Sequence, residues 1–258
     1  MNKIEQAFGR GKSFIPFITA GDPALEVTEK LIPAMADAGA DLIEIGIPFS
    51  DPVAEGPVIQ RADIRALAGG ATTAKIFEML RRVRARCSVP LAVMTYVNPV
   101  FTFGPDRFMR ECAAADVCAI IVPDVPYEEQ EELKPYCAKH GVALISMIAP
   151  TSRDRICRIA REAEGFLYCV SSLGVTGVRR DLDGDVDGMI GAVRQVSRIP
   201  CAVGFGISTP EQAAQMAKRA DGVIVGSAIV KLVEKYGADC VEPVAGYVRQ
   251  MKEAVRRG

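Results

Sequence analysis

Short apolar runs alternate with longer amphipathic stretches along the chain. Eight runs are almost purely apolar, which is typical of strands buried on both faces. They span residues 14–20, 42–47, 91–97, 118–122, 142–148, 166–170, 201–203 and 222–225. The stretches that carry apolar residues at helical spacing span residues 27–38, 74–84, 106–115, 128–139, 153–163 and 210–219. The alternation predicts repeated βα units around a parallel sheet, and eight units in 258 residues fit a closed (β/α)8 TIM barrel better than an open sheet.

No linker, low-complexity tract or block of like charges interrupts this pattern. We therefore expect residues 1–258 to form one α/β domain, with extra helical turns before the first strand and after the last. The final segment, residues 241–257, has apolar side chains near three-to-four spacing and is expected to pack outside the barrel. In such barrels the active site lies at the C-terminal ends of the strands.

The composition narrows the functional classes. The chain has 31 basic and 32 acidic residues, so nothing indicates binding to nucleic acid or to an anionic membrane. Residues 1–12 lack the apolar core of a signal peptide, and no segment stays apolar for the roughly 18 residues that a membrane span needs. We expect a soluble cytoplasmic protein whose 8 cysteines, which form no C-x-x-C pair, are reduced.

His140 is the only histidine, which excludes histidine-based catalytic triads and multi-histidine metal sites; we interpret it as a helix C-terminal cap.

The most informative segment spans residues 41–57, where a carboxylate lies inside an apolar strand and an acidic loop follows. Leu42, Glu44 and Gly46 share one face of the predicted strand, opposite three isoleucines. An isolated charge at position 44 is costly, and burial would raise its pKa until it holds a proton near neutrality, as a catalytic acid must. Together with a second carboxylate in the loop, Glu44 indicates acid/base chemistry.

Three glycine-containing loops follow predicted strands late in the chain, at residues 174–177, 204–210 and 225–227. Glycine lets the backbone approach a ligand closely, and the free N–H groups at a helix start attract phosphate. Each loop alone fits an ordinary turn equally well, but loops after the last strands are a recurrent phosphate site in these barrels, which favours phosphate binding. The second loop also predicts a helix start, with Thr209 and Gln212 forming a capping box around Pro210.

The acidic run at residues 183–188 imitates the start of a calcium-binding EF-hand. Its twelfth position is Arg194, however, where a bidentate Glu is needed, so calcium binding is not expected. We expect instead a mobile, solvated loop over about residues 171–187. Such a loop can close over a ligand and exclude water.

Aromatic side chains stand at the ends of several predicted strands. Phe17, Tyr96 and Tyr168 have two interpretations, either as barrel packing or as the walls of a pocket for a flat aromatic ligand. The polar residues at the same ends are Asp22, Asn98 and Asp124.

Five segments, in this order along the chain, resemble the tryptophan synthase alpha subunit family. They are residues 16–23 (PFITAGDP), 44–52 (EIGIPFSDP), 123–126 (PDVP), 174–177 (GVTG) and 204–208 (GFGIS). The resemblance covers nearly the whole chain, and residues 44–56 are its most specific part. It implies a (β/α)8 barrel that cleaves indole-3-glycerol phosphate to indole and glyceraldehyde 3-phosphate, in a retro-aldol reaction without a cofactor in this chain.

The resemblance also implies residue roles. Glu44 matches the family's general acid/base, and Glu55 stands where the family usually has a catalytic Asp. The extra methylene of Glu55 lengthens its reach by roughly 1.5 Å, enough to misplace a base if the loop does not compensate. By motif position, the residues expected around the indole are Phe17, Tyr96, Ile148 and Tyr168, and those expected at the phosphate are Gly177, Gly206, Gly226 and Ser227. Thr176 is expected to close against the loop that bears Glu55.

Members of this family work with a pyridoxal-phosphate beta subunit in an alpha2-beta2 heterotetramer, and the loop at residues 48–57 is expected to face that partner. Three alternatives stay open at this point. In the first, the chain is a free-standing lyase that releases indole without a partner. In the second, Glu55 makes the chain a weak catalyst whose main role is to activate a partner. In the third, the chain is a generic phosphosugar barrel enzyme. The last would keep the glycine loops but would not explain residues 44–57.

Overall fold

The computed structural model describes residues 3–170, 182–204 and 206–258. Within them, strands form one sheet in the order β5-β4-β3-β2-β1-β9-β8-β7-β6, and neighbouring strands run parallel. The strand bounds are β1 Ser13–Thr19, β2 Ile43–Gly46, β3 Leu91–Met94, β4 Ala119–Ile121, β5 Ala143–Leu144, β6 Ser146–Ile148, β7 Leu167–Val170, β8 Cys201–Gly204 and β9 Gly222–Val225.

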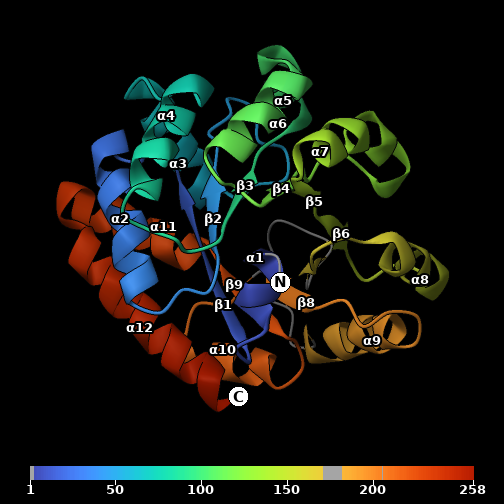
Figure 1. Cartoon of the computed structure of the whole chain (residues 1–258). Helices are drawn as coiled ribbons and strands as arrows, with labels where there is room; N and C mark the ends of the chain where they lie inside the picture. Colours follow the sequence, from blue (N-terminus) through green and yellow to red (C-terminus); the bar gives the residue numbers. More distant parts are fainter. Residues whose placement is uncertain (1–2, 171–181, 205) are drawn as a thin grey trace.

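The fifth apolar run closes the barrel. Its first part, β5, pairs with β4, and its second part, β6, pairs with β7. Between them, Ile145 donates its backbone N–H to the Ile120 carbonyl at 2.9 Å, so the run joins the two ends of the sheet. The predicted barrel of parallel strands is confirmed, and Figure 1 shows the helices arranged around the ring of strands.

Helices connect the strands and cover the outside of the barrel. Their bounds are α1 Lys3–Phe8, α2 Leu25–Asp37, α3 Pro57–Ala68, α4 Thr73–Arg84, α5 Val97–Phe103, α6 Pro105–Ala114, α7 Lys134–His140, α8 Arg153–Glu162, α9 Leu182–Arg194, α10 Pro210–Ala217, α11 Ser227–Tyr236 and α12 Val241–Arg257, with short 3-10 turns η1 Tyr127–Glu132 and η2 Gly237–Asp239. None of these helices combines the length and apolar character needed to cross a membrane.

Alternate residues of each strand face opposite sides of the sheet, which divides the core into two parts. Ile15 and Phe17 of β1 belong to a cluster inside the barrel, which we call the interior cluster. Phe14 and Ile18 belong to a larger cluster between the strands and the helices, the outer cluster. Because both faces of each strand are buried, the strands appear in the sequence as continuous apolar runs.

The N-terminal end of the barrel is closed by α1. Ile4 and Ala7 of this helix belong to the interior cluster, and the Phe8 ring lies 5.4 Å from the Phe166 ring, centroid to centroid. Figure 1 shows α1 in the middle of the ring of strands. The C-terminal ends of the strands are thus the end left for a ligand.

The last helix, α12, packs against α2, α10 and β1, as predicted for a helix outside the barrel. Lys252 on its buried side donates to the Asp41 carboxylate at 2.5 Å and to the Lys12 carbonyl at 3.0 Å. The Asp41 carboxylate also accepts the Phe14 N–H at 2.7 Å. This polar cluster ties the last helix to the start of the first strand.

The structure corrects two predictions about local structure. The prediction of a loop over residues 171–187 is wrong for its last residues, because α9 begins at Leu182. Residues 171–181 lie outside the described part of the chain. The helix predicted over residues 128–139 is divided into η1 and α7. Pro135 near the start of α7 has no N–H to continue the preceding turn, which explains the interruption.

Two smaller predictions are confirmed. His140 is the last residue of α7, followed by Gly141 in the left-handed conformation (φ 68°), and its Nε2 lies 3.0 Å from an Asp106 carboxylate oxygen. All 8 cysteines are free thiols.

Candidate active site

The central residue of the site is Glu44 on β2, whose side chain points into the barrel. In the parallel pairing it lies beside Phe17 of β1 and Ala92 of β3, two residues of the interior cluster. Glu44 is 1% exposed, and neither carboxylate oxygen has a hydrogen-bond partner within the described residues. The hydroxyl of Thr19, at the C-terminal end of β1, is buried and unpartnered in the same way. Buried polar atoms without partners at the mouth of a barrel are what a ligand-binding site requires.

Burial gives Glu44 the properties of an acid. It raises the pKa of Glu44 to about 8, with a further contribution from the negative charge of Glu55. At neutral pH Glu44 therefore holds a proton that it can deliver to a bound molecule.

Glu55 lies in the loop between β2 and α3, just before the N-cap residue Gly56. Its backbone is fixed on both sides: its N–H donates to the Pro52 carbonyl at 3.1 Å, and its carbonyl accepts from the side chain of Gln60 at 2.8 Å. Burial raises the pKa of Glu55 to about 7. The two carboxyl groups thus differ in the ease with which they lose a proton.

Tyr96, at the end of β3, holds the same loop. Its hydroxyl oxygen accepts the Ala54 N–H at 2.9 Å, and its ring lies 5.5 Å from that of Phe49. The charge of Glu55 contributes to raising the pKa of the Tyr96 phenol, after burial. Tyr96 is therefore a buried wall of the site and an anchor for the loop that carries Glu55.

Two further aromatic side chains occupy space that only glycine leaves open. A Cβ on Gly46 would lie 2.6 Å from the Phe17 ring, and a Cβ on Gly204 would lie 2.6 Å from the Tyr168 hydroxyl. Burial, then the charges of Glu44 and Glu55, raise the pKa of the Tyr168 phenol. Both rings belong to the interior cluster.

Ile148 is not brought together with these rings. It pairs with Cys169 on β7 and lies in the outer cluster, whereas its neighbour Met147 pairs with Tyr168 and packs against the interior cluster. The side chain of Ile148 therefore faces the helices, which corrects the expectation that it lines the same pocket.

The loops after β8 and β9 end in two helix starts with different chemistry. At α10, Thr209 and Gln212 form the predicted capping box, and the Gln212 side chain accepts the Ser208 N–H at 2.8 Å. At α11, no side chain caps the helix start at Gly226 and Ser227 in the described structure. Free backbone N–H groups there suit an anion, and Gly206 (φ 73°) has open space where a side chain would stand. Thr176 and Gly177 lie outside the described residues.

Comparisons with known proteins identify the family. The family model "Tryptophan synthase alpha chain" matches residues 5–256. The chain is 49% identical to the tryptophan synthase alpha chain of Geobacter sulfurreducens, over 95% of this chain and 93% of that one, and 45% identical to that of Lacticaseibacillus casei, over 99% and 96%. The chain belongs to the tryptophan synthase alpha chain family. The crystal structure of the alpha chain from Legionella pneumophila has a TM-score of 0.88 at 37% identity, over 99% of this chain and 97% of that one.

As a tryptophan synthase alpha chain, the protein is an indole-3-glycerol phosphate lyase that acts in tryptophan biosynthesis. Alpha chains use no cofactor; pyridoxal phosphate resides in the beta subunit. Because the chain belongs to this family, the alternative hypothesis of a generic phosphosugar barrel enzyme is excluded. The described residues contain no group of three or more His, Cys, Asp or Glu suited to a metal ion.

Three acidic residues on neighbouring elements complete the description of this alpha-chain site: Asp22 and Asp124 stood at predicted strand ends, whereas the sequence did not single out Asp63. Asp63 on α3 is 6% exposed, and burial, followed by the charge of Glu55, raises its pKa to about 7. Asp22, 2% exposed, makes two hydrogen bonds of 2.8 Å with Arg65 of α3. Asp124 accepts the Val97 N–H at 3.0 Å at the start of α5. A predicted helix over residues 57–68 would have indicated that Asp63 is buried, because it places Asp63 on the same face as the apolar residues Ile59, Ala62 and Ala66.

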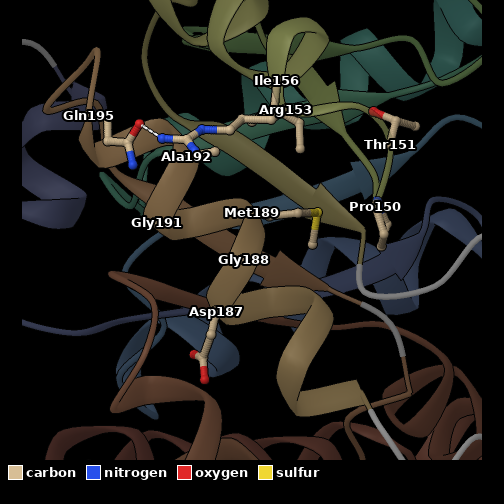
Figure 2. A pocket seen from close by; sticks show the side chains of 10 residues that line it. All are labelled: Pro150, Thr151, Arg153, Ile156, Asp187, Gly188, Met189, Gly191, Ala192 and Gln195. Atoms are coloured by element: carbon tan, nitrogen blue, oxygen red, sulfur yellow. Dashed lines mark hydrogen bonds between the residues drawn. The ribbon is translucent and has the colours of Figure 1, made fainter.

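A surface pocket of about 530 Å³ lies between α8 and α9 (Figure 2). Ile156 of α8 and Met189 of α9 line it, and Arg153 reaches across it to Gln195. Neither Glu44 nor Glu55 lines this pocket, so it is not part of the candidate active site.

Proposed function

We propose that this lyase uses Glu44 as its general acid/base and Glu55 as its second base. In the cleavage of indole-3-glycerol phosphate, the bond between indole C3 and the glycerol side chain breaks. C3 receives a proton, the bonding electrons pass to the ring, and the adjacent hydroxyl loses its proton as it becomes the aldehyde of glyceraldehyde 3-phosphate. The reaction thus needs one group that delivers a proton and one that accepts a proton.

The observation that carries this proposal is the state of the Glu44 carboxyl. It is fully buried, both its oxygens lack partners within the described residues, and its pKa is raised to about 8. A carboxylic acid in this state is protonated at neutral pH and free to act on a substrate. Glu55, with a pKa of about 7, loses its proton more readily and suits the role of base.

The surrounding residues support binding of the two ends of the substrate. We assign the indole to the apolar space between Phe17, Tyr96 and Tyr168, which are all buried. We assign the phosphate to the start of α11 at Gly226 and Ser227, where backbone N–H groups are uncapped. The remaining residues assigned to the phosphate side are Gly206 and, from the sequence alone, Gly177, while Thr176 is assigned, also from the sequence alone, to contact with the loop that bears Glu55.

The proposed partner is a beta subunit, in an alpha2-beta2 heterotetramer within the cytoplasm. The tryptophan synthase of Mycobacterium tuberculosis gives a TM-score of 0.89 with this chain at 32% identity, over 99% of this chain and 97% of that one. The loop at residues 48–57 carries Val53, an apolar side chain that is 77% exposed. An exposed apolar residue on the loop that bears Glu55 suits a partner that acts on the site through this loop.

The experiment is to measure indole release from indole-3-glycerol phosphate by the purified chain, with and without a tryptophan synthase beta subunit. We expect slow release that rises sharply with the beta subunit. High turnover without any partner would favour a free-standing lyase, and no release in either case would contradict the proposal.

A second candidate follows from Glu55, which stands where the family usually has Asp. In this alternative the chain is a weak catalyst whose main role is to stimulate its partner. The influence of the Glu55 charge on Glu44, Tyr96 and Tyr168 favours a functioning Glu55, because it lies near all three.

A further inference from the structure

Two arginines of α3 form a chain of ion pairs that joins three elements around the candidate active site. Arg65 donates to both carboxylate oxygens of Asp22, in the loop after β1, through two hydrogen bonds of 2.8 Å. The same guanidinium donates to Glu234 of α11 at 3.1 Å. Arg61, one turn earlier on α3, donates to both oxygens of Glu234 at 2.8 and 3.2 Å. Arg65 is thus the member of this chain that contacts both carboxylates.

The contact between Arg65 and Asp22 differs from an ordinary surface ion pair. Exposed pairs contribute little, but a bidentate arginine–carboxylate pair within a network fixes distance and direction. Asp22 is 2% exposed, and a carboxylate at such a position is costly unless an opposite charge or hydrogen bonds compensate it. Arg65 supplies both, so the loop after β1 and α3 are held at a defined separation.

The joined elements lead to different parts of the site. Helix α3 begins at Pro57, two residues after Glu55, so its position sets the end of the loop that bears this carboxyl group. Asp22 follows Thr19 by three residues and donates its backbone N–H to the Thr19 carbonyl at 3.3 Å. Helix α11 begins at Ser227, where we assign the phosphate. The ion pairs therefore connect the proposed base, the end of β1 and the proposed phosphate site.

Helix α11 needs such a connection because its remaining contacts fix its position less strictly. It packs against α3 and β1, and a Cβ on Gly226 would lie 3.3 Å from the Phe17 ring. Hydrophobic packing is non-directional, whereas hydrogen bonds set both distance and angle. Glu234 lies seven residues after Ser227, about 10 Å further along the helix. Its bonds to α3 thus fix the end of α11 opposite to the proposed phosphate site.

We propose that Arg65 is a positioning residue for the lyase reaction, which holds the phosphate-binding helix α11 in register with the helix that follows Glu55. The inference rests on the proposed assignment of the phosphate to the start of α11 and of the base to Glu55. A substrate held by its phosphate meets this base only as accurately as the two helices are placed, and a misplacement of about 1 Å can cost about 10²-fold in rate. Arg65 itself does not touch the substrate.

Three variants separate positioning from stability. Arg65→Met keeps the unbranched stem but removes every donor. Arg65→Lys keeps the charge but lacks the planar fork that serves two carboxylates at once. Arg65→Met alone leaves Asp22 as a buried, unpaired carboxylate, which destabilises the fold. The double variant Arg65→Met/Asp22→Asn removes that unpaired charge without restoring the link between the helices.

Arg82→Met is the matched control. Arg82 of α4 also donates to two carboxylates, to Glu29 at 3.0 Å and to Glu78 at 3.4 Å. It joins α4 to α2, and neither helix carries a residue assigned to the substrate. This variant therefore removes an equivalent pair of contacts from a part of the barrel that the inference does not involve.

The measurements are kcat and KM for indole release by the full chain, the competitive inhibition constant of inorganic phosphate, and the thermal midpoint of each variant. We expect kcat to fall about 10- to 100-fold in Arg65→Met and about 3- to 10-fold in Arg65→Lys. The inhibition constant of phosphate stays within about 2-fold, because the N–H groups that bind it belong to α11 itself. The double variant regains thermal stability but not kcat, and Arg82→Met keeps the kcat of the wild type.

The outcomes distinguish this inference from the proposed function. A wild-type chain that releases no indole contradicts the proposed function and the role of Arg65 with it. An active wild type whose folded Arg65 variants keep its kcat overturns the role of Arg65 alone. Recovery of kcat together with stability in the double variant shows a merely structural role, and a parallel loss of phosphate affinity shows an effect on the phosphate site itself; either result overturns the inference. If Arg65→Met does not fold, the double variant and Arg65→Lys still decide.

Discussion

The two ends of the barrel interior differ in how completely their side chains are satisfied. At the N-terminal end, Phe166 is fully buried against Phe8 of α1, and the Ser13 hydroxyl donates to the Ala7 carbonyl at 2.8 Å. At the C-terminal end, the Thr19 hydroxyl and both oxygens of Glu44 are buried without partners in the described structure. One end of the barrel thus stabilises the fold, and the other keeps costly groups available for a substrate.

The comparison indicates that the carboxyl groups with pKa values near neutrality lie at the end of the barrel where buried polar groups destabilise the fold. At the α1 end, the described residues leave no buried side-chain oxygen or nitrogen without a hydrogen-bond partner. At the opposite end, burial raises the pKa of Glu44 to about 8 and that of Glu55 to about 7. Substitutions at the C-terminal end should therefore lower kcat, whereas substitutions at the N-terminal end should lower the free energy of unfolding.

The largest expected effect is the loss of activity in Glu44→Gln. The amide fills nearly the same volume but cannot deliver a proton. We expect kcat for indole release to fall about 10²- to 10⁴-fold, the usual contribution of a general acid/base. Substantial activity in a folded Glu44→Gln protein would contradict the role of Glu44.

At the opposite end, Phe166→Ala should reduce stability and leave the chemistry intact. Removing this ring leaves a cavity beside Phe8, and we expect the free energy of unfolding to fall by about 3–5 kcal/mol. Denaturant unfolding measures this loss, and indole release at low temperature measures the activity of the folded fraction. A selective loss of kcat without loss of stability would contradict the division between the two ends.

Glu44→Gln should also change how stability depends on pH. Folding raises the pKa of Glu44 from 4.5 to about 8, so between these values the folded chain holds a proton that the unfolded chain has lost. Stability from this group therefore falls as pH rises through that window, and the substitution removes the decline. We expect Glu44→Gln to be more stable than wild type by about 1–3 kcal/mol at pH 9 and to show no advantage near pH 5, since the buried amide also lacks partners. Unfolding curves at the two pH values test this, and a constant difference would contradict it.

The smallest effect in this series is expected for Glu55→Asp. The loop that holds Glu55 is fixed by Tyr96 and Gln60, so it cannot advance to compensate for a shorter side chain. We expect kcat to fall about 10-fold because the base is withdrawn by roughly 1.5 Å. A gain of several orders of magnitude would instead support the reading of this chain as an impaired catalyst.

The barrel was predictable because its strands are buried on both faces and stand out as apolar runs. Helix α3 was not predicted, since Arg61 and Arg65 interrupt its apolar pattern, and their partners on other elements appear only in the folded chain. Asp63 was missed together with this helix. The segment at residues 44–57 indicated paired carboxyl groups, but no sequence pattern showed that the loop is held by Tyr96.

The orientation of Ile148 shows a different limit. The resemblance supplied the residue, but the face on which it lies depends on strand register. A shift of one position along a strand reverses the side to which a side chain points. The observed pairing places Met147, not Ile148, beside Tyr168.

The most direct test of the account is the pH profile of kcat/KM for indole release by the wild-type chain. The account predicts a bell whose acidic limb, near pH 7, reports loss of the proton from Glu55 and whose basic limb, near pH 8, reports loss of the proton from Glu44. A profile that rises near pH 4.5 and stays flat beyond pH 9 would contradict the claim that burial sets these two carboxyl groups to act as acid and base.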